Sequence, residues 1–430
     1  MKLKLKRDLS LVEATLYGIG IIIGAGIYVL IGPAAGLAGN AVWISFLIGA
    51  LIASFTGLSY AELSAMYPKA AAEFLYVKKA YGSKFWAFLI GWLLIFTGVV
   101  SAATVALGFS GCFIEILKLG KIFLIPVAIA LILFLSFINF SGIKESSRLN
   151  IIFTSIEVFG ILLIIFLGLP SLGDVKYFQM PFGFKGVLSA AAIIFFAYIG
   201  FEDIANIAEE TKSPKKFIPL AIITAVIVTT ILYIITSLIA VSLVDYRILR
   251  EAPNALAVVA SKTVLGENAY FLVSFITLFA TTGTVLIILV VTSRMVYGMA
   301  REYSLPSRLG RIHRRTKTPW LAVIAIMLLS IVFVFFGKIE VVANITSLGA
   351  FVTFAAVNLS LIWLRYTKPH LERPFKVPLN IGKYPIISIL GLAFCSFMIF
   401  QFDVELLLFG LGILVLGTIF YWLRRHKIIE

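Results

Sequence analysis

The sequence predicts an all-α integral membrane protein whose 430 residues cross the bilayer twelve times. The first reason is composition, since 61% of the residues are hydrophobic, only 13% are charged, and the mean hydropathy is +1.06. A soluble chain carries charges on about a quarter of its residues. The second reason is a series of twelve long apolar segments, and the third is the alternation of Lys and Arg between the connections. These observations exclude a soluble protein.

Each predicted helix is a window of roughly 20 apolar residues, the length that spans the hydrocarbon core of a bilayer. Ser10 and Glu13 form a capping-box pattern, which predicts that the first helix begins at residue 11. The twelve windows cover residues 11–36, 41–65, 84–116, 121–140, 148–169, 186–208, 217–244, 269–300, 319–337, 340–364, 384–402 and 405–423.

Lys and Arg are distributed unequally between the two sets of connections. Of the 36 basic residues, 27 fall on the two termini and on every second connection, when residues at helix ends are counted with the connection. The other connections carry 8, and Arg294 alone lies inside a predicted helix. The positive-inside rule therefore places both termini in the cytoplasm of a multi-pass protein of the cell membrane. The net charge of +15 is spread over these connections, where it contacts membrane lipid, and we expect no nucleic acid partner.

The first predicted helix contains a concentration of small residues, GIGIIIGAGIY at 18–28. Gly20 and Gly24 match the small-xxx-small pattern of closely packed membrane helices, so packing is one interpretation. Three adjacent small residues, Gly24, Ala25 and Gly26, exceed what packing needs. They predict an unwound point in the helix.

Unwinding at this point would create a site for two opposite charges. The N–H groups of Ala25, Gly26 and Ile27 would open a new helical segment, where the helix dipole favours a carboxylate. The carbonyls of residues 21–23 would suit an ammonium group, because backbone groups left unpaired in hydrocarbon are costly. Such a pair of partners matches an α-amino acid zwitterion.

The sixth predicted helix has a corresponding weak point, FFAYIGFEDI at 195–204. It lies five helices after the first, and a second copy of a five-helix unit must enter the membrane from the opposite side. This is the inverted repeat of secondary transporters, in which interrupted helices mark the binding site. We expect one transmembrane domain over 1–430, with a first repeat at 11–169, an inverted repeat at 186–364 and two further helices at 384–423.

Three carboxyl groups, those of Glu157, Glu202 and Asp203, fall inside predicted helices. Intramembrane ionisable residues are costly, and burial favours the neutral acid, so each is a candidate for proton coupling or gating, or a partner for a cation. The structural alternatives are a neutral Glu157 bonded to a neighbouring helix and a solvated Asp203 near a helix end. Glu62 lies near a predicted helix end and is expected at the interface.

No cofactor, metal centre or enzyme active site is predicted. No group of His, Cys and Asp has the spacing of metal ligands, and no Ser or Cys nucleophile has a base nearby in a predicted helix. Thr281, Thr282 and Thr284 of the eighth helix are placed to line a cavity, but Thr often bonds back to its own helix. Packing is therefore their first interpretation, and the sequence names no protein partner.

Several motifs resemble those of the amino acid–polyamine–organocation transporters, in order and over most of the chain. The closest resemblance is to the cationic amino acid transporter branch and its prokaryotic relatives. The motifs are GAGIYVL (24–30), YPKA (67–70), FFAYIGFE (195–202), AEETKSP (208–214), SR (293–294) with YGMAR (297–301), RRTKTPW (314–320) and RPFKVP (373–378).

The resemblance implies the ten-helix inverted repeat of the leucine-transporter type, with helices 1 and 6 interrupted, plus two extra helices. By position, the 25–27 segment would receive the substrate carboxylate. Ile23 and the carbonyls of Ala197 and Tyr198 would receive the α-amino group. The substrate-binding candidates are Ile23, Gly24, Ala25, Gly26, Ile27, Phe196, Ala197, Tyr198 and Gly200.

Two further positions carry an implied role, and one departs from the family. Phe196 matches a gating aromatic residue, and Glu202 matches an acidic position that some relatives associate with proton sensing. Several relatives have a Lys in helix 5 that is thought to replace a sodium ion. The matching position here is Glu157, which reverses the charge, so the resemblance does not extend to that lysine.

The sequence thus predicts a secondary active transporter that moves amino acids across the cell membrane by alternating access. Proton coupling is expected from Glu157 and Glu202. A sodium-coupled symporter and an exchanger are the alternatives within this class, and a membrane amino acid sensor is the alternative outside it. Cationic and neutral amino acids both fit the sequence.

Overall fold

The computed structural model describes residues 5, 7–252, 254–335 and 339–425. These residues form an all-α protein with a single short hairpin of strands β1 (Asn380–Ile381) and β2 (Tyr384–Pro385). The α-helices are α1 (Leu11–Ala38), α2 (Val42–Met66), α3 (Ala72–Tyr81), α4 (Lys84–Ile116), α5 (Leu124–Ser141), α6 (Ile143–Gly168), α7 (Gly183–Phe195), α8 (Asp203–Asn206), α9 (Pro214–Leu243), α10 (Tyr246–Glu251), α11 (Ala255–Ser261), α12 (Gly266–Arg301), α13 (Trp320–Val334), α14 (Ile339–Thr367), α15 (Ile386–Ile399) and α16 (Val404–Arg425). Short 3₁₀ turns are η1 (Gly39–Ala41), η2 (Lys121–Phe123), η3 (Leu169–Ser171), η4 (Phe196–Tyr198), η5 (Ala208–Glu210) and η6 (Ser307–Gly310).

Each of the twelve predicted windows overlaps an apolar helix. Among the described residues, ten helical segments are long and apolar enough to cross a membrane, and α13 and α15 are shorter apolar helices. The largest boundary error is at α6, which begins at Ile143 and not at 148. Gly142, with φ 149°, separates α5 from α6, which begins at the next residue. Arg148 therefore belongs to α6 and not to the connection before it. The sequence did not predict α3, α10 or α11, which are too short to register as membrane spans.

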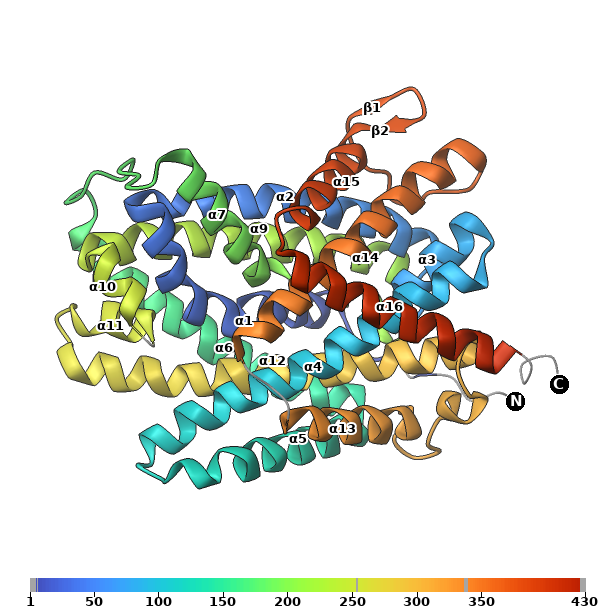
Figure 1. Ribbon diagram of the computed structural model, residues 1–430, viewed down its shortest axis with the longest axis horizontal. Helices are drawn as coiled ribbons and strands as arrows, with labels where there is room; N and C mark the ends of the chain where they lie inside the picture. Colours follow the sequence, from blue (N-terminus) through green and yellow to red (C-terminus); the bar gives the residue numbers. More distant parts are fainter. Residues whose placement is uncertain (1–4, 6, 253, 336–338, 426–430) are drawn as a thin grey trace.

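α1 lies at the centre of the bundle, in contact with α6, α7, α9 and α12 (Figure 1). α1 and α12 are largely buried, whereas α16 runs along the outside of the molecule against α4 and α14 and is mostly exposed. The central helices are thus buried, whereas the peripheral helix exposes apolar side chains on its outer face. This distribution is typical of a helix bundle in lipid.

The first helix begins and breaks where the sequence predicts. The backbone N–H of Ser10 donates to Glu13 Oε2 at 2.8 Å and the N–H of Glu13 donates to Ser10 Oγ at 3.3 Å, which confirms the capping box. Gly24 interrupts the helical geometry with φ 20° and ψ −146°. Gly20 has a different role, since a Cβ there would meet Thr154 of α6, so this glycine allows close helix packing. Both interpretations of the small-residue pattern therefore hold, at different residues.

The sixth predicted helix is also interrupted. α7 ends at Phe195, η4 follows, and Ile199 is extended with φ −60° and ψ 133° before Gly200 takes φ 124°. The chain resumes a helix only at Asp203, for the four residues of α8. Glu202 and Asp203 thus lie at the start of the second helical piece, not within a continuous helix.

Candidate functional site

The two helix breaks lie directly against each other. A Cβ added to Gly26 would lie 2.7 Å from Ala197 Cα, and one added to Gly200 would lie 2.8 Å from Ile21 Cγ1. Only glycine allows these backbones to approach so closely, and the positive φ of Gly200 excludes a side chain for a second reason. The structure therefore brings the two predicted weak points together as one structural unit.

A tyrosine that the sequence did not single out connects the two breaks. The Tyr233 hydroxyl of α9 donates to the carbonyl of Ile22 at 2.6 Å, and the carbonyls of Ala197 and Ile23 lie at 3.0 and 3.5 Å from the same oxygen. The hydroxyl thus reaches carbonyls on both sides that unwinding frees from helical hydrogen bonds. Tyr233 lies in an apolar helix far along the chain, and only the tertiary fold shows this contact.

We expect Tyr233→Phe to loosen the pairing of the two breaks. Removal of the hydroxyl leaves buried carbonyls without a donor, which costs about 1–3 kcal/mol of unfolding free energy. Thermal unfolding in detergent measures this loss, with Tyr303→Phe at a residue that is 62% exposed as the matched control. Equal unfolding temperatures for the two variants would contradict the bridging role.

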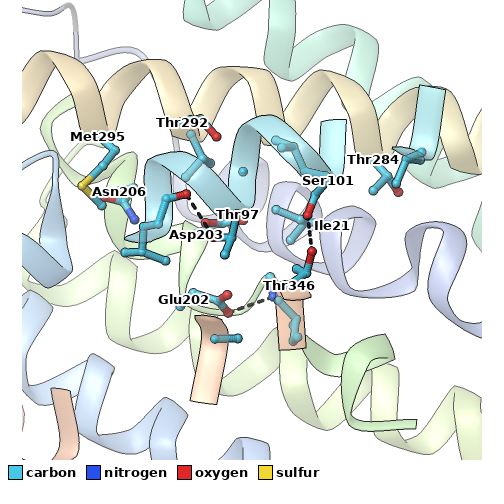
Figure 2. A pocket seen from close by; sticks show the side chains of 18 of the residues that line it. Ile21, Thr97, Ser101, Glu202, Asp203, Asn206, Thr284, Thr292, Met295 and Thr346 are labelled. Carbon is cyan, nitrogen blue, oxygen red and sulfur yellow. Dashed lines mark hydrogen bonds between the residues drawn. The ribbon is translucent and has the colours of Figure 1, made fainter. Parts of the chain in front are cut away.

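A cavity with about 950 Å³ of empty space opens beside the paired breaks. α1, α4, α12 and α14 form its walls, together with the second break and α8 (Figure 2). Hydroxyl groups gather on these walls, and Ser101 and Thr346 share a hydrogen bond of 2.6 Å between α4 and α14. The space and the mixture of apolar and hydroxyl side chains are typical of a small-molecule site. The lining residues are Ile21, Ile22, Gly26, Glu73, Leu94, Thr97, Gly98, Ser101, Val105, Phe196, Ile199, Gly200, Glu202, Asp203, Asn206, Thr284, Ile288, Val291, Thr292, Met295, Thr346 and Ala350.

Five of the predicted site residues line this cavity, namely Gly26, Phe196, Gly200, Glu202 and Asp203. The other predicted substrate-binding residues are buried at the two breaks and do not line the cavity: Ile23, Gly24, Ile27, Ala197 and Tyr198. The backbone of Ala25 is part of the break, and its side chain lies outside the described residues. All three threonines, Thr281, Thr282 and Thr284, bond back to their own helix, and Thr284 also lines the cavity.

One end of the cavity is acidic. Glu73, Glu202 and Asp203 line it, whereas no Lys, Arg or His belongs to its lining among the residues that the structure describes. Glu202 Oε2 accepts a hydrogen bond of 2.8 Å from the N–H of Gly200, so this carboxyl stabilises the break as well as facing the cavity. Asn206 Nδ2 donates to both oxygens of Glu73, at 3.3 and 3.1 Å. The sequence did not indicate Glu73, because it lies in α3, which is too short to be recognised as a membrane span.

Burial raises the pKa of the Glu73 carboxyl from 4.5 to about 7. The folded protein therefore holds a proton that the unfolded chain releases between these two pH values, and stability falls as the pH rises from about 4.5 to 7. We expect Glu73→Gln to remove up to about 3 kcal/mol of this pH dependence. Unfolding temperatures from pH 5 to 8 measure it, with the exposed Glu372→Gln as control. The same pH dependence in Glu73→Gln and wild type would contradict this role of Glu73.

Glu157 does not line the cavity. It lies on α6 with 1% exposure, its Oε2 has no hydrogen-bond partner among the described residues, and its backbone carbonyl accepts from the Tyr28 hydroxyl at 2.8 Å. Glu157 therefore lies outside the cavity, on a helix that packs against α1. Its role in proton coupling remains a prediction.

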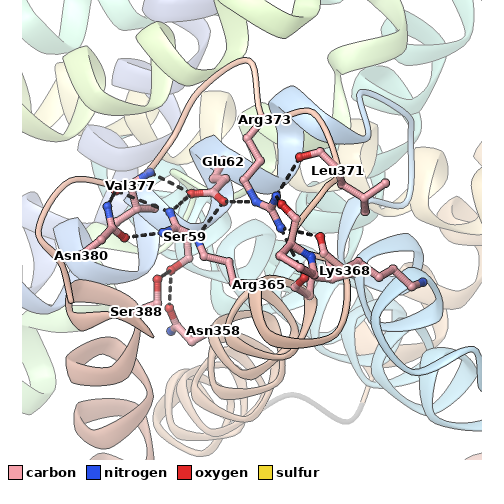
Figure 3. Close-up of polar contacts among 12 residues, drawn as sticks. Ser59, Glu62, Asn358, Arg365, Lys368, Leu371, Arg373, Val377, Asn380 and Ser388 are labelled. Atoms are coloured by element: carbon pink, nitrogen blue, oxygen red, sulfur yellow. Dashed lines mark hydrogen bonds and ion pairs between the residues drawn. The ribbon is translucent and has the colours of Figure 1, made fainter. Parts of the chain in front are cut away.

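Glu62 lies near the end of α2, and its expected position at the membrane interface remains a prediction. It is fully buried and forms ion pairs with Arg365 and Arg373, the latter at 3.1 Å (Figure 3). Its Oε2 also accepts from the N–H of Val377 at 2.8 Å. Two arginines and a backbone donor offset the cost of burying this charge, and together they hold the connection after α14 against α2.

Arg294, the basic residue inside a predicted helix, is also fully buried. Its Nε lies 3.2 Å from Glu210 Oε2, and it bonds to Asn139 of α5. This pair connects α12 to the segment that follows α8. The sequence placed Arg294 inside an apolar helix and gave no partner for it; the pairing with Glu210 offsets the cost of burying its charge.

The fold is that of a multi-pass membrane protein with a cavity beside two interrupted helices. The family model described as amino acid permease matches residues 9–410. The chain belongs to the amino acid permease family. This family and its curated relatives are transporters, so the chain is a membrane transporter and not an enzyme.

Three relatives show the range of the similarity. The chain is 31% identical to the branched-chain amino acid permease BcaP of Bacillus subtilis (strain 168), over 98% of this chain and 94% of the relative. It is 30% identical to the methylthioribose transporter of the same organism, over 99% and 95%. It is 31% identical to the vacuolar cationic amino acid transporter 4 of Arabidopsis thaliana, over 85% of this chain and 64% of that protein.

Proposed function

We propose that the protein is a secondary active transporter of amino acids in the cytoplasmic membrane, with both termini in the cytoplasm. The observation that carries the proposal is the pairing of the two breaks beside the cavity. The Gly26 and Gly200 backbones face each other's helices there, so donor N–H groups and acceptor carbonyls meet at one place. An α-amino acid supplies the carboxylate and ammonium group that such a place binds.

The proposed mechanism is alternating access by twelve spans, arranged as two inverted five-helix repeats and two further helices. Phe196 supports it, because this ring lines both the central cavity and a second cavity of about 1480 Å³ between α2, α7 and α15. Movement of one side chain then connects or separates the two spaces. The second cavity includes Phe397, Gln401 and Asp403 on the side opposite Glu73.

The acidic end of the cavity influences which substrate side chains the cavity accepts. Three carboxyls without a basic neighbour in the lining disfavour an anionic side chain and favour a cationic one, while the apolar wall of Leu94, Val105 and Ile288 accepts a neutral side chain. The substrates named for two of the three relatives, branched-chain and cationic amino acids, fall in these two classes, and the third relative is named for methylthioribose. Aspartate and glutamate are therefore expected to be the poorest substrates.

The test is counterflow in proteoliposomes against a panel of cationic, neutral and acidic amino acids, with and without a pH gradient. Counterflow of at least one neutral or cationic amino acid, accelerated when the outside is acidic, is the expected result. Binding without counterflow would identify a sensor, and uptake that requires sodium and ignores pH would replace proton coupling with sodium coupling.

A further inference from the structure

Four polar side chains follow one face of α6, outside the substrate cavity. Ser147, Asn150, Thr154 and Glu157 are spaced by three, four and three residues, which places them above one another on a helix. Each side chain is 1% exposed. The opposite face of α6 carries Ile152 and other exposed apolar residues, so the polar row faces protein and not lipid.

Each member of this row has a polar atom without a partner. In the part of the chain that the structure describes, Ser147 Oγ, Asn150 Nδ2, Thr154 Oγ1 and Glu157 Oε2 are buried and form no hydrogen bond. Buried polar atoms in native proteins are nearly always paired, with protein or with ordered water. Four unpaired atoms in succession on one helix face therefore point to small polar molecules as partners.

Glycines of the neighbouring helices cover the row. A Cβ on Gly20 of α1 would lie 3.2 Å from Asn150 Nδ2, and one on Gly283 of α12 would lie 3.1 Å from Glu157 Oε1. α6 packs against both α1 and α12 (Figure 1). Because glycine presents no side chain, the polar atoms of α6 face backbone rather than bulky apolar groups.

The ionisable groups that face Glu157 from other helices are tyrosines. Tyr28 of α1 bonds to its carbonyl, and Tyr233 of α9 interacts with it electrostatically. Among the described residues, no Lys, Arg or His forms an ion pair with Glu157. The charge of the Glu157 carboxyl is therefore set by the gain or loss of a proton and is not neutralised by a basic side chain among these residues.

We infer that the row Ser147–Asn150–Thr154 is the route by which protons pass between Glu157 and the cytoplasmic end of α6, separate from the path of the substrate; this rests on the proposed proton-coupled transport. Consecutive members are three or four residues apart, which is about 4.5–6 Å along the helix axis. One water molecule that makes two hydrogen bonds of about 2.8 Å spans such a gap. The row begins near Ile143, at the end of α6 that the charge distribution places in the cytoplasm.

The chemistry of the row suits transfer in steps. The hydroxyls of Ser147 and Thr154 both donate and accept, so each passes a proton on by forming one O–H bond as another breaks. The amide of Asn150 orients water without carrying the proton. When the Glu157 acid releases its proton into the row it becomes a carboxylate, and a water molecule at the cytoplasmic end of the row becomes hydronium.

Thr154→Val tests the route, because valine keeps the shape and removes the hydroxyl. In proteoliposomes we expect accumulation driven by a pH gradient to fall about tenfold, the effect of losing one hydrogen bond to a charged species. Counterflow of the same amino acid at equal pH should stay within about twofold of wild type, because the row lies outside the cavity. Thr418→Val on peripheral α16 is the matched control, and Ser147→Ala with Ser155→Ala on the exposed face is a second matched pair.

The outcomes separate the route from the transport itself. Loss of driven accumulation with counterflow retained, in Thr154→Val and Ser147→Ala but in neither control, supports the route. Wild-type accumulation by both Thr154→Val and Ser147→Ala overturns it and leaves proton-coupled transport intact. Wild-type protein that shows counterflow but no response to pH overturns both the route and the proton coupling, while a chain without counterflow contradicts the proposed function.

Discussion

Gly26→Val is expected to abolish substrate binding. Its Cβ would lie 2.7 Å from Ala197 Cα and 2.8 Å from Ala197 Cβ, and because the first of these is backbone, no flexible side chain can move away. The valine would force the two breaks apart and fill the place of the substrate carboxylate. The loss of charge-assisted hydrogen bonds to a carboxylate should weaken binding by on the order of a hundredfold.

Equilibrium binding of the best amino acid from the panel measures this effect. The matched control is Gly108→Val, at a helical glycine of α4 where a Cβ would meet nothing within 4 Å. Size-exclusion chromatography and thermal unfolding of both variants establish that they fold. A folded Gly26→Val protein that binds as tightly as wild type would show that the site lies elsewhere.

Glu157→Gln is expected to uncouple transport from protons. Gln has nearly the same shape as Glu but does not titrate, and Glu157 is a fully buried acid without a basic partner among the described residues. Because Glu157 lies outside the cavity lining, the substrate site should persist. Accumulation driven by a pH gradient should fall to the level of passive exchange, a loss of at least about tenfold.

The control is Glu267→Gln, at an exposed residue in the first turn of α12. Initial rates of uptake at external pH 5.5 to 7.5 distinguish the two variants. An unchanged pH response in Glu157→Gln would assign coupling to another carboxyl, with Glu202 and Glu73 in the cavity as the remaining candidates.

The sequence predicted the scaffold of the molecule because the signals were local. Apolar windows located the twelve apolar helices, Ser10 and Glu13 marked the start of α1, and adjacent small residues marked the break at Gly24. α3 could not be predicted in this way, because it is a ten-residue helix, too short to span a membrane, and its burial depends on packing against α4 and α14.

The parts of the site that the sequence missed depend on contacts between distant residues. The Tyr233 hydroxyl meets the Ile22 carbonyl across 211 positions, and Glu62 meets Arg365 across 303. No local pattern distinguishes Tyr233 from another tyrosine in an apolar helix. The position of Glu62 near a helix end did not indicate its arginine partners, because they lie far along the chain.

The central claim is that the paired breaks bind the α-amino and α-carboxyl groups of a substrate together. The most direct measurement is competition against counterflow of the best amino acid by its decarboxylated and its deaminated analogues. The account predicts that each analogue competes only at a concentration roughly ten- to a hundredfold higher than the amino acid, because each loses one charged partner worth on the order of 1.5–3 kcal/mol. Equal competition by the amine or by the acid alone would contradict it.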